Sequence, residues 1–201
     1  MIKLPTFSVK AVLFFIALMP FSIMVWRAVN NDLGANPVEK LTQLSGLWSL
    51  RFLLITLALT PFRLLFKQLW VIKYRRMLGL FTFFYCSVHF AIFVALENSF
   101  SWRYIMEDVY SSPVVDVGLL TYLLLIPLAF TSTNNMMRKL GKAWKKLHIS
   151  VHVVALLSIL HFVLSEKADI SRALFYGIIL IVLLAIRGVV RNKNKQGASV
   201  N

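Results

Sequence analysis

Long apolar runs separated by short polar segments dominate the chain. Six of them are close to the roughly 20 residues that an α-helix needs to cross about 30 Å of hydrocarbon. They cover residues 11–29, 47–66, 77–96, 114–133, 147–164 and 172–190. The pattern predicts an all-α integral membrane bundle of six transmembrane helices. Because no long polar stretch interrupts the runs, we expect a single transmembrane domain over residues 1–201.

Composition supports a membrane protein. The chain is 59% hydrophobic, with a mean hydropathy of +0.74, which lies outside the range of ordinary soluble domains. Its single cysteine, Cys86, excludes an internal disulfide, a cysteine-based zinc site and an iron–sulfur cluster.

The basic residues predict the orientation, because Lys and Arg are concentrated on cytoplasmic segments. With both termini cytoplasmic, sixteen of the 22 basic residues lie on or beside that face: Lys3, Lys10, Arg63, Lys67, Lys73, Arg75, Arg76, Arg138, Lys139, Lys142, Lys145, Lys146, Arg187, Arg191, Lys193 and Lys195. All eight acidic residues lie at or near the opposite face: Asp32, Glu39, Glu97, Glu107, Asp108, Asp116, Glu166 and Asp169. The formal charge of +14 then reflects topology and attraction to anionic membrane lipid, and we expect no nucleic-acid partner.

Four histidines lie within or at the edge of these runs: His89, His148, His152 and His161. Ionisable residues in a bilayer are functional candidates, and imidazole is the usual axial ligand of haem iron. Counting 1.5 Å per residue from Arg76 and Lys146 puts His89 about 20 Å and His161 about 22 Å above the inner boundary. This shared depth predicts a haem between His89 and His161, in preference to isolated packing histidines or a proton relay.

Three further residues are candidates for contacts with a haem. Arg51 lies at about 24 Å from the inner boundary, where it either pairs with a haem propionate or extends to the outer headgroups. His148 lies near the inner boundary and about 140° from His161 around an ideal helix, so one haem cannot use both. A second haem on His148 would have a non-histidine second ligand, His152 after rearrangement, or none. His152 has the weakest claim to be a ligand.

Three segments carry a family resemblance: LGANPVEKLTQLSGLWSLRFLLITLALTP (33–61), RRMLGLFTFFYCSVHF (75–90) and LAFTSTNNMMRKLGKAWKKLH (128–148). They resemble the MsrQ family, the haem-binding membrane subunits of periplasmic protein-methionine-sulfoxide reductase systems, within the ferric-reductase-like transmembrane group. The resemblance covers about residues 30–190. It implies that His89, His148 and His161 hold haem b, whereas His152 departs from the family pattern, which has an aromatic residue there.

The resemblance also implies a function. The chain is expected to be an electron-transfer subunit of the bacterial inner membrane that is not catalytic alone. Its implied partner is a periplasmic, molybdopterin-containing catalytic subunit of the MsrP type, which reduces methionine sulfoxide in damaged envelope proteins. The implied electron source is the quinone pool, and FMN is associated with the family.

The end of the sequence bears on the electron donor. Only RNKNKQGASVN follows the last run, and no G-x-G-x-x-G motif follows a predicted strand. We therefore expect electrons from a quinol or from a separate cytosolic flavin reductase. The basic inner residues either determine topology alone or also bind a flavin phosphate: Arg75, Arg76, Arg138, Lys142, Lys145 and Lys146.

Other function classes remain open at this point. One is a self-contained ferric-reductase-like enzyme, which the missing nucleotide-binding motif disfavours. Another is a proton or ion transporter that uses the histidines as a relay without haem. A structural or assembly factor is a third, and the last two predict a colourless protein.

Overall fold

A computed structural model describes residues 6–166 and 169–198, with side chains from residue 9 to 166 and from 169 to 190. Among these residues, six helical stretches are long and apolar enough to cross a membrane, and no strand is present. They are Val9–Val29, Pro37–Phe66, Leu69–Glu97, Pro113–Phe130, Lys142–Ser165 and Ser171–Val190. The predicted all-α bundle of six spans is confirmed. The predicted basic position Lys3 lies outside the described residues, as do the side chains of Arg191, Lys193 and Lys195.

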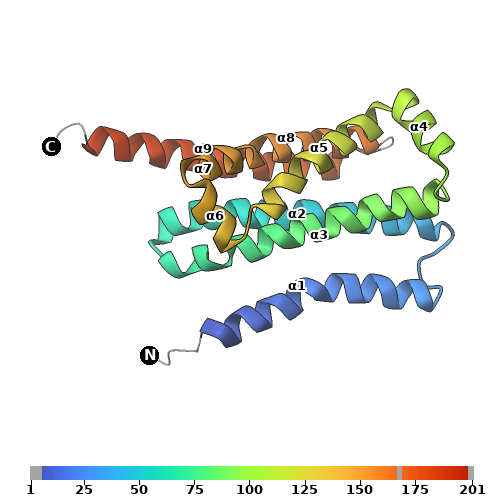
Figure 1. Ribbon diagram of the computed structural model, residues 1–201, viewed down its shortest axis with the longest axis horizontal. Helices are drawn as coiled ribbons and strands as arrows, with labels where there is room; N and C mark the ends of the chain where they lie inside the picture. The colour runs from blue at the N-terminus through green and yellow to red at the C-terminus, as the bar shows by residue number, and fades with distance from the viewer. Residues whose placement is uncertain (1–5, 167–168, 199–201) are drawn as a thin grey trace.

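The long helices run along a common direction (Figure 1). They are α1 (Thr6–Val29), α2 (Pro37–Phe66), α3 (Arg75–Ile92), α5 (Pro113–Phe130), α8 (Val151–Ser165) and α9 (Ser171–Ala198). In Figure 1, α2 and α3 lie side by side, with α5, α8 and α9 along one side and α1 along the other. Shorter elements join them: the 3-10 helix η1 (Leu69–Tyr74), the π-helical turn η2 (Phe93–Glu97), α4 (Trp102–Ser111), α6 (Asn134–Leu140) and α7 (Lys142–Ile149).

The second helix begins at Pro37, well before the predicted start at residue 47. The reason is a polar N-terminal cap that an apolar count does not register. The Asn36 side chain accepts a hydrogen bond from the Glu39 backbone N–H at 3.4 Å and donates one to the Glu39 carboxylate at 2.8 Å. Proline at the first helical position has no N–H to leave unsatisfied there. The additional turns carry residues that contact the site described below.

Other predicted boundaries also shift. The fourth span ends at Phe130 rather than at residue 133, because Thr131 and Ser132 hydroxyls donate to the carbonyls of Pro127 and Leu128, both at 2.6 Å. The fifth span is two helices, α7 and α8, which meet at Ser150, and it starts before the predicted residue 147. The sequence did not predict the short helices α4 and α6.

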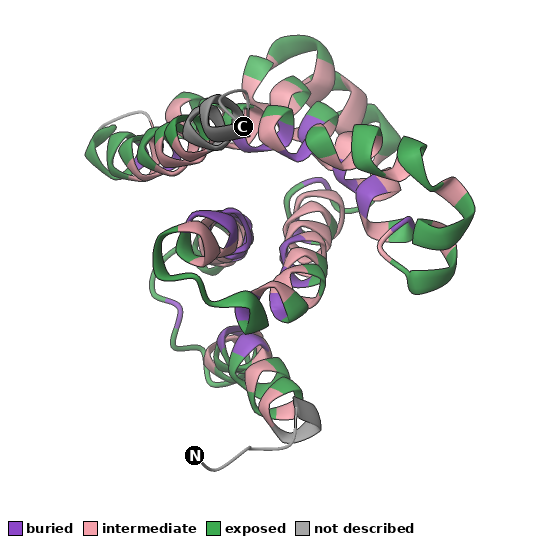
Figure 2. Ribbon diagram, turned by 90° about the vertical axis from the view of Figure 1, so that its left-hand side faces the viewer, coloured by how far each residue is buried: buried purple, intermediate pink, exposed green. Residues whose placement is uncertain are grey.

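Two apolar clusters hold the bundle together, and their buried residues face the interior between the helices (Figure 2). The larger joins α2, α5, α8 and α9 through side chains such as Leu53, Val154 and Leu180. The smaller docks α1 onto α2 and α3 around Ala17, Phe52, Tyr74, Leu78, Phe81 and Tyr85. Large apolar side chains on the outward helix faces remain exposed, as suits a lipid environment.

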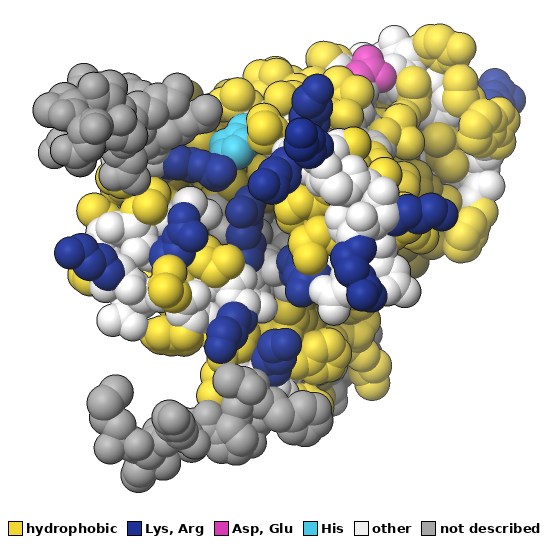
Figure 3. All heavy atoms as spheres, turned by 60° about the vertical axis from the view of Figure 1, so that its left-hand side comes forward, with side chains coloured by type: hydrophobic (Ala, Val, Ile, Leu, Met, Phe, Trp, Pro, Cys, Tyr) yellow, Lys and Arg dark blue, Asp and Glu magenta, His cyan; other side chains and the backbone are white. Residues whose placement is uncertain are grey.

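The two ends of the bundle differ in charge. We call the end with Lys67, Lys73, Arg76, Arg138, Lys142 and Lys145 the basic end, and the end with Glu39, Glu97, Glu107, Asp108, Glu166 and Asp169 the acidic end. Lys and Arg side chains gather over the face shown in Figure 3. The N-terminal end of α1 and the C-terminal part of α9 lie at the same end of the molecule in Figure 1.

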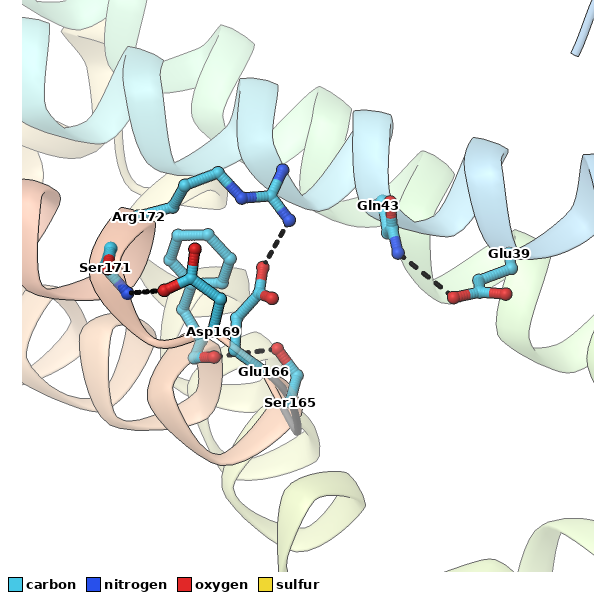
Figure 4. A network of polar contacts seen from close by, with 8 residues as sticks. Glu39, Gln43, Ser165, Glu166, Asp169, Ser171 and Arg172 are labelled. Atoms are coloured by element: carbon cyan, nitrogen blue, oxygen red, sulfur yellow. Dashed lines mark hydrogen bonds and ion pairs between the residues drawn. The ribbon is translucent and has the colours of Figure 1, made fainter.

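Polar contacts order the turn between α8 and α9 at the acidic end (Figure 4). Arg172 forms an ion pair with Glu166 at 2.7 Å, and the Ser171 backbone N–H donates to the Asp169 carboxylate at 2.8 Å. Hydrogen bonds from the Ser171 side chain and backbone lower the pKa of Asp169, because they stabilise its charged form.

Candidate functional site

Two histidines from different helix pairs face each other inside the bundle. The pairs are the hairpins α2–α3 and α5–α8, whose helices contact each other. His89 on α3 and His161 on α8 have ring centroids 6.0 Å apart, with planes at 87°. Two imidazoles that share one metal ion through bonds of about 2 Å, with each ring centre about 1 Å behind its nitrogen, have centroids about 6 Å apart. The spacing of this histidine pair therefore fits a shared metal centre.

Hydrogen bonds determine which nitrogen of each ring carries the proton. Nδ1 of His89 lies 3.0 Å from the Thr42 carbonyl oxygen, and Nδ1 of His161 lies 2.9 Å from that of Val114. A carbonyl only accepts, so Nδ1–H is the donor in both rings. The lone pair of each Nε2 is then available, and within the described residues no hydrogen bond occupies it. Metal-bound histidines typically show this arrangement, with the second nitrogen donating to a carbonyl.

The basic end has a separate cavity of about 470 Å³ between α2, α3, α5 and α7. His148 lines it, and its Nε2 is buried without a hydrogen bond among the described residues, as is the Thr56 hydroxyl opposite. Trp144 stacks on His148 with centroids 3.9 Å apart, and its indole N–H donates to the Thr131 carbonyl at 2.9 Å. We call this space the basic-end cavity.

Cations line the same cavity: Lys73, Arg75 and Arg76. Arg76 also donates to the side chain of Asn134. His148 is the one imidazole in the described lining, and Met137 is its one thioether. Arg76 precedes His89 by thirteen positions, and His148 precedes His161 by the same number. At the level of the basic-end cavity, one histidine-bearing segment therefore carries an arginine and the other carries a histidine.

Arg51 has two neighbours that the sequence did not indicate. Its Nε donates to the Tyr176 hydroxyl on α9 at 2.9 Å, and its guanidinium lies 4.7 Å from the centre of the Trp48 ring. No hydrogen bond is present at its other guanidinium nitrogens within the described residues. The propionate role of Arg51 remains a prediction.

His152 lies apart from the histidine pair. Arg187 donates to its Nε2 at 2.9 Å, and its Nδ1 lies 2.8 Å from the Ile149 carbonyl. Because arginine only donates, His152 Nε2 is the acceptor and has no lone pair left for a metal. This contact gives His152 a role in packing α8 against α9.

Sequence reasoning missed the groups that hold the histidine pair. These are the carbonyls of Thr42 and Val114, the glycines that follow them, Gly46 and Gly118, and the Ser45 hydroxyl, which lies 3.3 Å from Nδ1 of His89. A backbone carbonyl has no signature in a sequence, but the equal separations do: the histidine follows the carbonyl residue by 47 positions in both cases. No group of three or more His, Cys, Asp or Glu side chains gathers in the described part of the chain.

A bundle of six helices long and apolar enough to cross a membrane indicates a multi-pass membrane protein, and the facing imidazoles in its interior suit a metal or cofactor site. The sequence profile of the ferric reductase like transmembrane component matches residues 45–159, which include His89 and His148. No solved structure matches the chain.

Similarity to curated proteins identifies the family within this class. The chain is 43% identical over 182 residues to the protein-methionine-sulfoxide reductase heme-binding subunit MsrQ of Herminiimonas arsenicoxydans, covering 89% of this chain and 84% of that protein. It is 45% identical over 177 residues to the MsrQ of Xanthomonas euvesicatoria (85% and 81% covered). It is 44% identical over 181 residues to the MsrQ of Bordetella pertussis (89% and 88% covered). The chain belongs to the MsrQ family.

Proposed function

We propose that the chain is the haem-b electron-transfer subunit of a protein-methionine-sulfoxide reductase system. The observation that carries this proposal is the histidine pair, with centroids 6.0 Å apart. Both Nδ1–H groups are occupied by carbonyls, and both Nε2 lone pairs are available. The names of the curated relatives, which describe haem-binding subunits, support the same cofactor.

The residues around the pair suit electron transfer. When bound, haem b supplies reversible one-electron chemistry. His89 and His161 would hold the haem iron through their Nε2 atoms, and ligation by two histidines would favour electron transfer over oxygen chemistry. Arg51 is proposed as the partner of a haem propionate, since two of its guanidinium nitrogens remain for a bidentate contact with a carboxylate.

The basic-end cavity is proposed as a second cofactor site with His148 as ligand. The buried, unpaired Nε2 of His148 supports this role, because an unsatisfied buried polar atom is costly unless a ligand meets it. Arg75 and Arg76 suit an anionic group, either a haem propionate or the phosphate of FMN.

The remaining assignments follow from the family and the charge asymmetry. The chain resides in the bacterial inner membrane with the basic end and both termini in the cytoplasm. Electrons enter there from quinol or from a cytosolic flavin reductase. They leave at the acidic end to a periplasmic molybdopterin-containing catalytic subunit of the MsrP type. The chain is not catalytic alone.

Visible spectroscopy of the purified protein tests the proposal. We expect a Soret band, with sharp α and β bands after dithionite. His89→Ala and His161→Ala should each abolish the low-spin signal of the pair. His152→Ala is the matched control, because that ring already accepts from Arg187, and it should leave the signal unchanged.

Two results would contradict the proposal. One is a folded protein that stays colourless after haem-supplemented expression, as a histidine-relay transporter would. The other is an unchanged low-spin spectrum in either single variant of the pair, since each imidazole is required for two-histidine ligation.

A further inference from the structure

The two histidines are held by the same backbone arrangement used twice. In the first hairpin, His89 on α3 donates to the Thr42 carbonyl on α2 at 3.0 Å. In the second, His161 on α8 donates to the Val114 carbonyl on α5 at 2.9 Å. Each carbonyl belongs to a helical residue, so its first lone pair faces the N–H of the next turn. The imidazole uses the second lone pair.

A glycine stands four positions after each of these carbonyls. A side chain in a helix lies over the turn that precedes its own Cα, so residue i+4 normally covers the carbonyl of residue i. Gly46 and Gly118 have no side chain, and the Thr42 and Val114 carbonyls stay open to the imidazoles. The rings lie directly against the glycines as a result.

A methyl group at either position would meet the ring. A Cβ on Gly118 would lie 2.7 Å from Cε1 and 3.0 Å from Nδ1 of His161. On Gly46, the corresponding distances to Cε1 and Nδ1 of His89 are both 3.2 Å. The first contact requires the ring to move, and the second requires an adjustment of a few tenths of an ångström. An alanine is therefore more disruptive at position 118 than at position 46.

We propose that Gly46 and Gly118 are positioning residues for the histidine pair. By uncovering the Thr42 and Val114 carbonyls, they select the Nδ1–H tautomer and aim both Nε2 atoms at the shared centre. The hydrogen bonds do not depend on a bound group, but the ligand role of the rings rests on the proposed function. A hydrogen bond from Nδ1–H also makes the imidazole a more basic ligand.

The other helical glycines whose surroundings the structure describes, Gly79, Gly177 and Gly188, lack this relationship. A Cβ on Gly177 of α9 would make an ordinary contact of 3.5 Å with the Ile159 side chain. Gly177→Ala is therefore the matched control, because it makes the same chemical change in a spanning helix without touching a histidine.

The experiment compares Gly46→Ala, Gly118→Ala and Gly177→Ala in the purified full-length protein. Haem content, the low-temperature electron paramagnetic resonance spectrum and the midpoint potential are measured, together with the thermal midpoint. We expect Gly118→Ala to reduce haem retention at the pair about 10- to 100-fold, the usual effect of losing such an outer partner. Gly46→Ala should keep the low-spin signal with a raised potential, since weaker hydrogen bonding lowers ligand basicity. Gly177→Ala should match the wild type.

The outcomes separate this inference from the proposed function. If wild type shows no low-spin haem, the proposed function fails. If wild type is intact and Gly118→Ala and Gly46→Ala both leave the resonance spectrum and the potential unchanged, the positioning role is refuted. If Gly118→Ala does not fold, the milder Gly46→Ala decides, because a purely structural glycine would lower the thermal midpoint without moving the potential.

Discussion

Tyr85→Phe isolates a single buried hydroxyl that ties α1 to the rest of the bundle. Tyr85 is fully buried. Its hydroxyl donates to the Ala17 carbonyl at 2.8 Å and accepts from the Phe21 backbone N–H at 3.0 Å. These two groups are the partners of one ordinary helical hydrogen bond, so the hydroxyl inserts into the ladder of α1 beside Pro20. The variant removes the hydroxyl and keeps the aromatic ring.

The expected loss is about 1–2 kcal/mol of unfolding free energy. Side-chain hydrogen bonds within membranes average about 0.6 kcal/mol, with some near 1.7 kcal/mol, and two are removed. Buried N–H and carbonyl groups without partners add to this loss, whereas direct closure of the Phe21–Ala17 bond reduces it. Packing changes little, because the ring still stacks on Phe52 at 5.3 Å.

Unfolding by sodium dodecyl sulfate, followed by tryptophan fluorescence, measures this free energy. Amide hydrogen exchange at Phe21 reports the α1 ladder and should accelerate in the variant. Tyr110→Phe is the control, because Tyr110 is 84% exposed and its hydroxyl has no buried partner. A loss no larger than that of the control, with unchanged exchange at Phe21, would refute the role assigned to the hydroxyl.

Two further changes test the polar contacts around the site. Arg51→Gln removes a cation at the level of the histidine pair and should lower the midpoint potential by roughly 1 kcal/mol, or about 40 mV for one electron, if Arg51 faces a propionate. Tyr176→Phe keeps the charge and removes only the 2.9 Å bond, so an equal shift in both variants would exclude the electrostatic explanation. Gly141 joins α6 to α7 at φ +49° and ψ −114°, so Gly141→Ala should cost about 1–3 kcal/mol of strain and lower cofactor retention in the basic-end cavity. Thermal unfolding measures the strain, and cofactor content measures the retention. Gly188→Ala is the control, because a Cβ at that position meets nothing within 4 Å. Equal effects of the two alanine substitutions would contradict the strain argument.

The spans were predictable because each is a continuous apolar run of the required length. The start of α2 was not, because residues 37–46 are mixed in polarity and their helical state depends on the cap at Asn36. This error had a consequence for the site. Thr42 and Gly46 lie on those missed turns, so the contact between α2 and His89 could not be predicted from the sequence.

Helical rise predicted the shared depth of His89 and His161, and the structure brings their rings to 6.0 Å from each other. The hydrogen-bond partners of these histidines could not be predicted, because they depend on which helices are neighbours in the bundle. Apolar periodicity does not specify the neighbours when most helix faces are apolar. Arg51 illustrates this limit. Its depth was available from the sequence, but its contact with Tyr176 depends on α2 lying beside α9.

The repeated carbonyl–glycine–histidine unit suggests how one fold comes to hold two unlike sites. Hairpins α2–α3 and α5–α8 present similar units near the acidic end, in each of which the histidine follows the carbonyl residue by 47 positions. They differ in the Ser45 hydroxyl, which lies 3.3 Å from Nδ1 of His89 and has no counterpart at Val117. Thirteen positions earlier on each histidine-bearing segment, the equivalence ends, with Arg76 in one hairpin and His148 in the other. Arginine has no lone pair to offer a metal, but it carries a permanent charge that attracts carboxylates and phosphates. The same two-hairpin frame therefore offers two imidazoles at one level and an imidazole opposite a cation at the other, and the second level is the one suited to an anionic cofactor.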